Sequence, residues 1–148
     1  MPPRRSKLFP TPEDAETAFY EAFERADLAA MMAVWAESDD VVCIHPLGLR
    51  LTGFEAVRES WVQIFSSGSQ LRVRATESKR YDGQSVAVHS VVEVLTAPGH
   101  QGAAQSVLAT NVYELGDAGW RMVLHHATHV PEAAPPADEP PAPTHTLH

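Results

Sequence analysis

Four side chains that can carry or orient a proton stand out in the 148-residue chain, because their neighbours are mostly apolar. His45 follows the β-rich run 41–44 and precedes Pro46, so an imidazole with an ordinary pKa of about 6.5 ends a predicted strand. Glu93, Asn111 and His126 lie in later strand-like runs. These residue types predict acid–base chemistry on a small molecule.

Each of these residues also has a purely structural explanation. His45 could cap the strand end by bonding nearby backbone, and Asn111 could bond a neighbouring strand or a buried water, since a buried amide must satisfy its donor and its acceptor. Glu93 could be a solvated edge carboxylate, and His126 a core histidine tied to a backbone carbonyl. The sequence leaves both explanations open for every one of them.

Two histidines and a carboxylate can also form a metal triad, but the spacing here is not diagnostic. His125, His126 and His129 lie on one predicted strand and alternate between its faces, so at most two of them could share an ion. We expect no metal and no cofactor. Cys43, the one cysteine, is expected to be a buried, inert thiol.

The first half of the chain predicts three helices and a short strand. Thr11–Asp14 is a helix start, with Thr at the N-cap, Pro in the first turn and acidic residues at the positive end of the dipole. Asp27 can cap a second helix, and Gly53 precedes a third. The short strand covers residues 41–45.

From residue 70 onward the polarity period becomes two, which predicts strands at about 70–81, 85–96, 105–115 and 119–130, with turns at 82–83, 97–99 and 117–119. Helices followed by an antiparallel meander indicate an α+β fold with the helices on one face of the sheet. We expect one domain over residues 11–130, a flexible arm over 1–10 and a disordered Pro/Ala-rich tail over 131–148.

Alternation predicts which side chains share a face of the last strand. The bulk of Trp120, Met122 and Leu124 favours the helix side, which puts His126 on that face and His125 on the opposite one.

The run 85–96 is apolar on both faces, and only one face can be covered by helices. One set comprises Ala87, His89, Val91, Glu93 and Leu95, and the other Val86, Val88, Val92 and Val94. A soluble monomer seldom leaves a contiguous apolar sheet open to water. We therefore expect a homodimer that packs through the outer sheet face, where Leu108 and Val112 join the valines.

The formal charge of −8, from 11 basic and 19 acidic residues, argues against a nucleic-acid partner. The longest apolar stretches fall far short of the roughly 20 residues that span a bilayer. The basic residues near the start lead to Pro10 rather than to the apolar centre of a signal peptide. We expect no nucleic-acid or membrane partner and a cytoplasmic location.

Several strings resemble the NTF2-like superfamily, and more narrowly its SnoaL-like and ketosteroid-isomerase-like branch. They are Ala26-Asp27-Leu28, Ile44-His45-Pro46-Leu47-Gly48, Thr52-Gly53-Phe54-Glu55-Ala56-Val57, Asn111-Val112-Tyr113 and the run 119–126. The resemblance covers residues 11–130 and implies a cone, in which a curved antiparallel sheet wraps the long first helix and a pocket opens between helices and sheet. The superfamily includes isomerases, cyclases, dehydratases, non-catalytic pocket proteins and oligomerisation modules.

The resemblance also implies roles for single residues. His45 stands where the steroid isomerases carry an aspartate base, and Asn111 where they carry a protonated acid that donates to the oxyanion. Their helical tyrosine falls near Phe19, which has no hydroxyl, while Tyr20 points about 100° away. Kinase association domains of the superfamily carry a pocket-lining arginine near Glu93, which implies that its set of side chains faces inward.

We therefore expect one pocket with His45, Glu93, Asn111 and His126 as catalytic candidates. Its expected ligand-binding lining is aromatic: Phe19, Trp35, Trp61, Tyr113 and Trp120. One hypothesis is an isomerase, cyclase or dehydratase that runs acid–base chemistry next to a carbonyl of a small apolar or carbonyl-containing ligand. The other is a non-catalytic ligand-binding or oligomerisation module.

Overall fold

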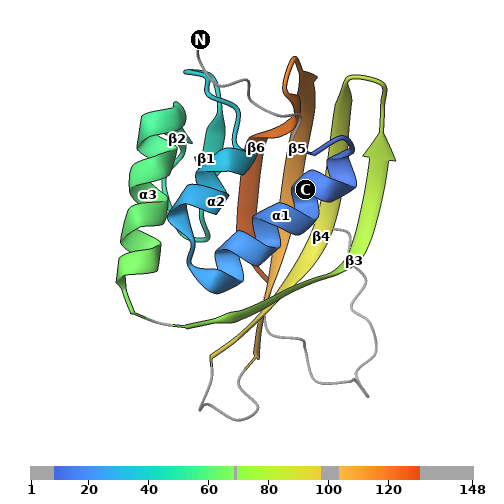
Figure 1. The fold of residues 1–148 in the computed structure, drawn as a ribbon. Helices are drawn as coiled ribbons and strands as arrows, with labels where there is room; N and C mark the ends of the chain where they lie inside the picture. The colour runs from blue at the N-terminus through green and yellow to red at the C-terminus, as the bar shows by residue number, and fades with distance from the viewer. Residues whose placement is uncertain (1–8, 69, 98–103, 131–148) are drawn as a thin grey trace, which may run out of the picture.

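The computed structural model describes residues 9–68, 70–97 and 104–130. In chain order the elements are α1 (Pro12–Arg25), α2 (Leu28–Val34), β1 (Val42–Ile44), β2 (Leu51–Thr52), α3 (Phe54–Ser66), β3 (Arg72–Asp82), β4 (Val86–Thr96), β5 (Ala104–Gly116) and β6 (Gly119–His129). The three helices lie against one face of a single curved sheet (Figure 1). The expected α+β architecture is confirmed, while the tail, residues 1–8 of the predicted arm and most of the turn at 97–99 fall outside the described residues. Phe9, which the sequence predicts to belong to the flexible arm, packs against the core instead.

The helix starts follow from local chemistry, as predicted. The hydroxyl of Thr11 accepts a hydrogen bond from the backbone N–H three residues on, and the carboxylate of Asp27 does the same for α2, at 3.1 and 3.0 Å. Gly53 caps α3 with φ of +100°, a conformation that side chains disfavour. Its N–H donates to the carbonyl of Val41, which ties the start of α3 to β1.

The sheet order is β2-β1-β6-β5-β4-β3. The meander β3–β6 is antiparallel throughout, as expected, but β1 pairs with β6 in parallel, so the expectation of a wholly antiparallel sheet is wrong at this pairing. Polarity alternation defines a strand without defining its direction relative to a distant partner, so it cannot detect this. The two-residue strand β2 is too short to give a pattern.

The strand β6 changes face partway along its length. Tyr113 pairs with Met122, yet the preceding residue of β5 pairs with Leu124, so Val123 is an extra residue that forms a β-bulge. Before the bulge Met122 faces the helices, and after it His125 does. The prediction that His126 faces inward is therefore wrong: its side chain is exposed on the outer face.

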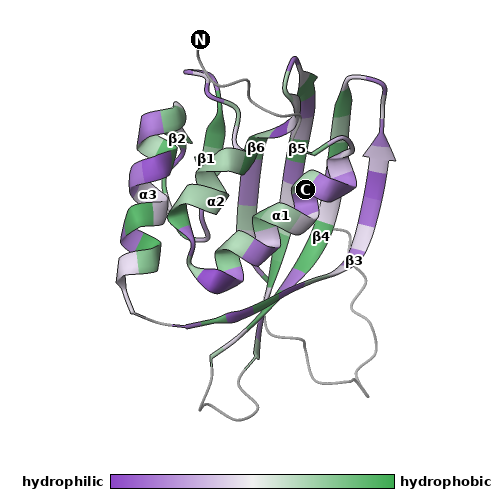
Figure 2. Cartoon of the chain, viewed as in Figure 1, coloured by the Kyte–Doolittle hydropathy of each residue, from purple (hydrophilic) through white to green (hydrophobic). Residues whose placement is uncertain are grey.

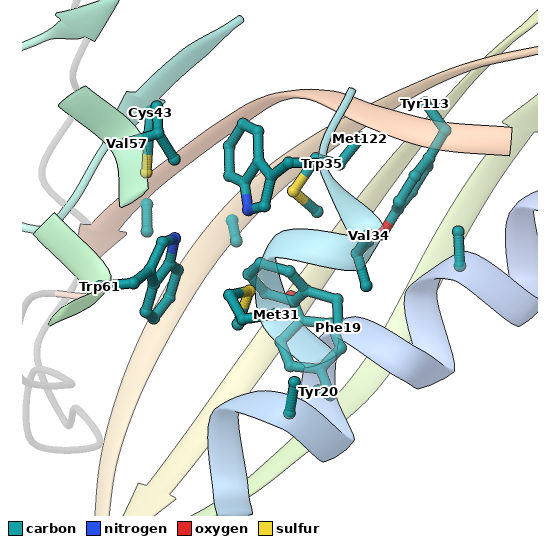
Figure 3. Close-up of a cluster of buried hydrophobic side chains, with 14 of the residues drawn as sticks. Phe19, Tyr20, Met31, Val34, Trp35, Cys43, Val57, Trp61, Tyr113 and Met122 are labelled. Atoms are coloured by element: carbon teal, nitrogen blue, oxygen red, sulfur yellow. The ribbon is translucent and has the colours of Figure 1, made fainter. Parts of the chain in front are cut away.

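The core lies between the helices and the concave face of the sheet. Figure 2 shows hydrophobic residues along β4 and β5, whereas the edge strand β3 is largely hydrophilic. Aromatic and sulfur-containing side chains from all three helices meet those of the sheet in this core (Figure 3). Among the described helices, none is long and apolar enough to cross a membrane.

The two faces of β4 differ as the alternation predicts. Ala87, His89, Val91 and Glu93 are buried toward the helices. On the outer face, Val86 and Val88 are 44% and 37% exposed, and Leu108 of β5 is 45% exposed. The outer face therefore presents apolar side chains to solvent in the single chain.

Candidate functional site

A chain of buried hydrogen bonds crosses the interior from β4 to β6. The Tyr20 hydroxyl lies 2.7 Å from Glu93 Oε2, Asn111 Nδ2 lies 2.9 Å from the Tyr20 oxygen, and His125 Nδ1 lies 2.6 Å from Asn111 Oδ1. All four side chains are at most 7% exposed. We call them the Glu93–His125 chain.

The directions of these hydrogen bonds fix the protonation of the histidine. The Tyr20 hydroxyl donates to the Glu93 carboxylate, so the Tyr20 oxygen accepts from the Asn111 amide group. The Asn111 oxygen must then accept, which places the proton of the neutral imidazole on Nδ1 of His125. Its Nε2 therefore carries a lone pair and can accept a hydrogen bond.

Burial shifts the ionisation of both ends of the chain. It raises the pKa of Glu93 to about 7, although the hydrogen bond from Tyr20 opposes the shift. Burial lowers the pKa of His125 to about 3, and the nearby His45 and His126 lower it further. At neutral pH the chain thus joins a neutral imidazole to a carboxyl group poised near its titration point.

His45 follows the last residue of β1, where the chain turns at Pro46, and is half-buried. Its Nε2 lies 3.0 Å from Ser60 Oγ, and the Ser60 hydroxyl donates to the carbonyl of Val57. Because that hydroxyl proton is already used, Nε2 donates and Nδ1 carries the lone pair. Burial lowers the pKa of His45 to about 4, so at neutral pH the residue is an uncharged base.

Trp61 connects His45 to the buried chain. Its ring meets the His45 ring edge-on with centroids 4.9 Å apart, and lies 6.3 Å from the ring of His125. The His45 and His125 rings are themselves 6.3 Å apart. Phe19 packs against both Trp61 and His125. The two imidazoles thus pack against the same tryptophan ring.

The structure brings together three of the four predicted catalytic candidates, His45, Glu93 and Asn111, and excludes His126. The predicted aromatic residues are all buried: Phe19, Trp35, Trp61, Tyr113 and Trp120. Positions alone assign none of them a catalytic or binding role.

Sequence reasoning missed Tyr20 and His125. The rings of Tyr20 and Phe19 are in edge-on contact, with centroids 4.8 Å apart, and both residues are buried because the concave sheet covers more than one stripe of α1. His125 was misplaced by the bulge, whose signal is three consecutive apolar residues, 122–124, in an otherwise alternating strand.

Three buried polar atoms near this site have no hydrogen-bond partner among the described residues: Trp35 Nε1, Trp61 Nε1 and the Tyr113 hydroxyl. Figure 3 shows the indole nitrogens of Trp35 and Trp61 directed toward the space between the two rings. Burial raises the pKa of Tyr113, and the charges of Glu16 and Glu93 add to the rise. This hydroxyl therefore stays protonated.

A second buried histidine, His89, belongs to a separate cluster, which contacts α1 at Glu16, one helical turn before Tyr20. Its Nδ1 lies 2.5 Å from Glu16 and its Nε2 3.0 Å from Asp82. Burial alone would lower the pKa of His89, but the two carboxylates outweigh it and the pKa is raised. We call this group the His89 clamp, since it ties α1 to β3 and β4.

No group of three His, Cys, Asp or Glu side chains in the described part of the chain is arranged to hold a metal ion. Cys43 lies 3.4 Å from His45 Nε2, and burial raises the pKa of its thiol to about 12.

Comparison with known proteins places the chain in a family. A sequence model of the SnoaL-like domain matches residues 13–131. The chain belongs to the SnoaL-like domain family. This SnoaL-like domain is 29% identical over 115 residues to the F-box protein SKIP8 of Arabidopsis thaliana. The match covers 76% of the chain but 46% of the plant protein, so the chain spans about half the length of that relative.

Solved structures give the same assignment. A proposed calcium/calmodulin-dependent protein kinase type II association domain from Thiobacillus denitrificans is 44% identical, with a TM-score of 0.74 over 83% of this chain and 98% of that one. A proposed dehydratase of the NTF2-like family from Streptomyces avermitilis is 27% identical, with a TM-score of 0.72 over 79% and 92%. A proposed ketosteroid isomerase from Parabacteroides distasonis shares the fold at 18% identity, TM-score 0.66, over 82% and 89%. The predicted membership of the NTF2-like superfamily is confirmed.

Proposed function

We propose that this SnoaL-like domain binds a small carbonyl-containing molecule and moves a proton at the carbon next to the carbonyl, as an isomerase, cyclase or dehydratase does. The observation that carries the proposal is the pairing of an uncharged base with a poised acid in one interior. Burial holds the pKa of His45 at about 4 and that of Glu93 at about 7. Groups whose environments push their pKa values apart are typical of acid–base sites.

Each polar residue then has a role. His45 accepts the proton at Nδ1, because its Nε2 is bound to Ser60. Asn111 donates to the carbonyl oxygen as negative charge develops there, through the second hydrogen of its amide group beyond the one given to Tyr20. Tyr20 and His125 are positioning residues, since they hold the amide in one orientation from opposite sides.

The family supports this reading without specifying a reaction. One solved structure at 27% identity is described as a proposed dehydratase, one of the reaction classes considered for this chain. The likeness to the proposed ketosteroid isomerase supports the fold alone.

Hydrogen exchange tests the proposal without knowledge of the natural substrate. We would incubate 1-tetralone and other small neutral ketones with the protein in D2O and follow the α-proton signals by NMR. Faster exchange with the wild type is expected, reduced about 100-fold by Asn111→Leu or His45→Gln. Circular dichroism would confirm that both variants fold. Equal exchange by the wild type and both variants would contradict the proposal.

A second candidate function is association, favoured by the exposed apolar side chains of the outer sheet face. We propose a homodimer built on Val86, Val88 and Leu108, because their exposure in the single chain leaves apolar area to bury. The 44% identical structure is itself described as a proposed association domain. Sedimentation at micromolar concentration is expected to show a dimer, and a 16.2 kDa species alone would contradict it. The cytoplasmic location remains a prediction.

A further inference from the structure

Two indole N–H groups are buried here without an acceptor. Trp35 and Trp61 are 1% and 0% exposed, and neither Nε1 atom has a hydrogen-bond partner among the described residues. Native proteins pair nearly all buried donors, because an unpaired one forfeits its bond to water without replacement. Two such donors in one core call for an explanation beyond packing.

The two donors come from different elements and are directed into the same region. Trp35 follows α2 and bridges to Met122 of β6, whereas Trp61 lies in the middle of α3. In Figure 3 the two indole nitrogens lie on the sides of the rings that face each other. Trp61 also touches His45, so this region adjoins the proposed catalytic base.

The charges around this region restrict what can bind there. Among the buried basic side chains of the described residues, Arg121 donates to the carbonyls of Ala118 and Trp120, and His89 is bound to Glu16 and Asp82. The two imidazoles that contact Trp61, those of His45 and His125, are uncharged at neutral pH and offer no compensating cation. A buried anion without a cation is strongly disfavoured. An uncharged oxygen is the acceptor that fits.

We propose that Trp35 and Trp61 form a second oxygen subsite, in which the two indole N–H groups bind one uncharged oxygen of the ligand. The inference rests on the proposed function, since it assumes that the same ligand places its reactive carbonyl at Asn111. It narrows the ligand to an uncharged molecule with two separated oxygen functions, a carbonyl and a hydroxyl or second carbonyl. The two indole N–H groups bind the second oxygen and disfavour a carboxylate at that position.

A matched ligand series tests this. The series comprises 1-tetralone, 4-hydroxy-1-tetralone and 1-tetralone-4-carboxylate, which differ at one ring position, and tetralin, which has no oxygen. We would titrate each into the full-length 15N-labelled protein and follow the three indole N–H signals, assigned from single Trp→Phe variants. The hydroxy ketone is expected to shift the Trp35 and Trp61 signals and leave the Trp120 signal in place.

Affinity gives the second readout. The hydroxy ketone is expected to bind about tenfold more tightly than 1-tetralone, and more tightly than the carboxylate. Trp35→Phe and Trp61→Phe should each remove that advantage, so that each variant binds the hydroxy ketone and 1-tetralone equally, because each variant keeps an aromatic ring and loses the N–H. The NMR titration of the wild type still tests the subsite if a variant fails to fold.

Several outcomes would overturn the subsite. They are equal affinity for the hydroxy ketone and 1-tetralone, tighter binding of the carboxylate, or unmoved Trp35 and Trp61 signals up to the solubility of the hydroxy ketone. Failure of the subsite is distinguishable from failure of the proposed function. Exchange of α-protons that depends on His45 and Asn111 can persist with the tryptophan response absent, and the tryptophan response can be present without exchange.

Discussion

The Glu93–His125 chain and the His89 clamp each hold a buried histidine beside α1, yet the pKa of that histidine shifts in opposite directions in the two. In the chain, neutral groups, Tyr20 and Asn111, separate acid from imidazole, so desolvation dominates and both ends favour their uncharged forms. In the clamp, two partly exposed carboxylates contact one imidazole directly and raise its pKa. Direct contact with carboxylates favours the protonated form of a buried histidine, whereas neutral neighbours leave desolvation to favour the uncharged form.

The largest effect is expected from breaking the chain at its centre. Asn111→Leu removes the acceptor of His125 Nδ1 and one donor to Tyr20, so we expect about 100-fold slower α-proton exchange and a loss of about 2 kcal/mol in unfolding free energy. NMR exchange and urea unfolding measure the two quantities. An unchanged free energy of unfolding would show that these hydrogen bonds contribute nothing net to the fold.

The pH dependence of stability sharpens the comparison on the acidic side. The folded pKa of Glu93, about 7, lies above the ordinary value of 4.5, so its stabilising contribution is present below pH 4.5 and is lost as pH rises to about 7. Glu93→Gln should remove this decline and, at pH 8, raise the unfolding free energy relative to wild type by about 2 kcal/mol. Urea midpoints between pH 4 and 8 would test it, and parallel curves for the two proteins would contradict it.

Breaking the His89 clamp is expected to change the stability of the fold without changing α-proton exchange. His89→Gln loses the cation between Glu16 and Asp82, and we expect destabilisation of about 1–2 kcal/mol at pH 6, with α-proton exchange unchanged. Because the folded pKa of His89 is raised, its contribution is present below the ordinary value of 6.5 and is lost as pH rises through the folded pKa. The stability difference between variant and wild type should therefore shrink at alkaline pH. A slowed exchange reaction would show that the two regions are coupled.

The smallest effect is expected at His126, next to the chain in sequence but exposed on the outer face. His126→Ala should change the unfolding free energy by less than about 0.5 kcal/mol and leave exchange at the wild-type rate. The matched substitution His125→Ala should impair both, since it leaves Asn111 Oδ1 unpaired. Equal effects of the two substitutions would contradict the position of the bulge in β6.

Local chemistry predicted most of the fold and part of the site. Thr11, Asp27 and Gly53 mark helix starts because capping depends on residues close in sequence. Alternation grouped Glu93 with Ala87, His89 and Val91 because β4 is regular, and the family resemblance implied that this set faces inward. It failed at His126, where the phase depends on a bulge formed against β5, and at β1, whose partner is set by tertiary packing.

Tyr20 shows the same limit on a helix. A periodic stripe predicts one buried face, but the curvature of the sheet decides how wide that face is, and curvature is a property of the whole domain. The orientation of the Asn111 amide could not be read from the sequence either, because it depends on two partners more than 10 residues away in the chain.

The parallel pairing of β1 with β6 makes the site a late product of folding. Cys43 lies beside His125 in this pairing, roughly 80 residues away along the chain, and such distant contacts form only after a large loop has closed. His45 leaves one of these strands and His125 comes from the other, so the two imidazoles meet only when the last strand has docked. Any partly folded state without β6 can hold helices and a meander, yet it has no assembled site. The proposed proton chemistry would thereby be confined to molecules that have completed the sheet.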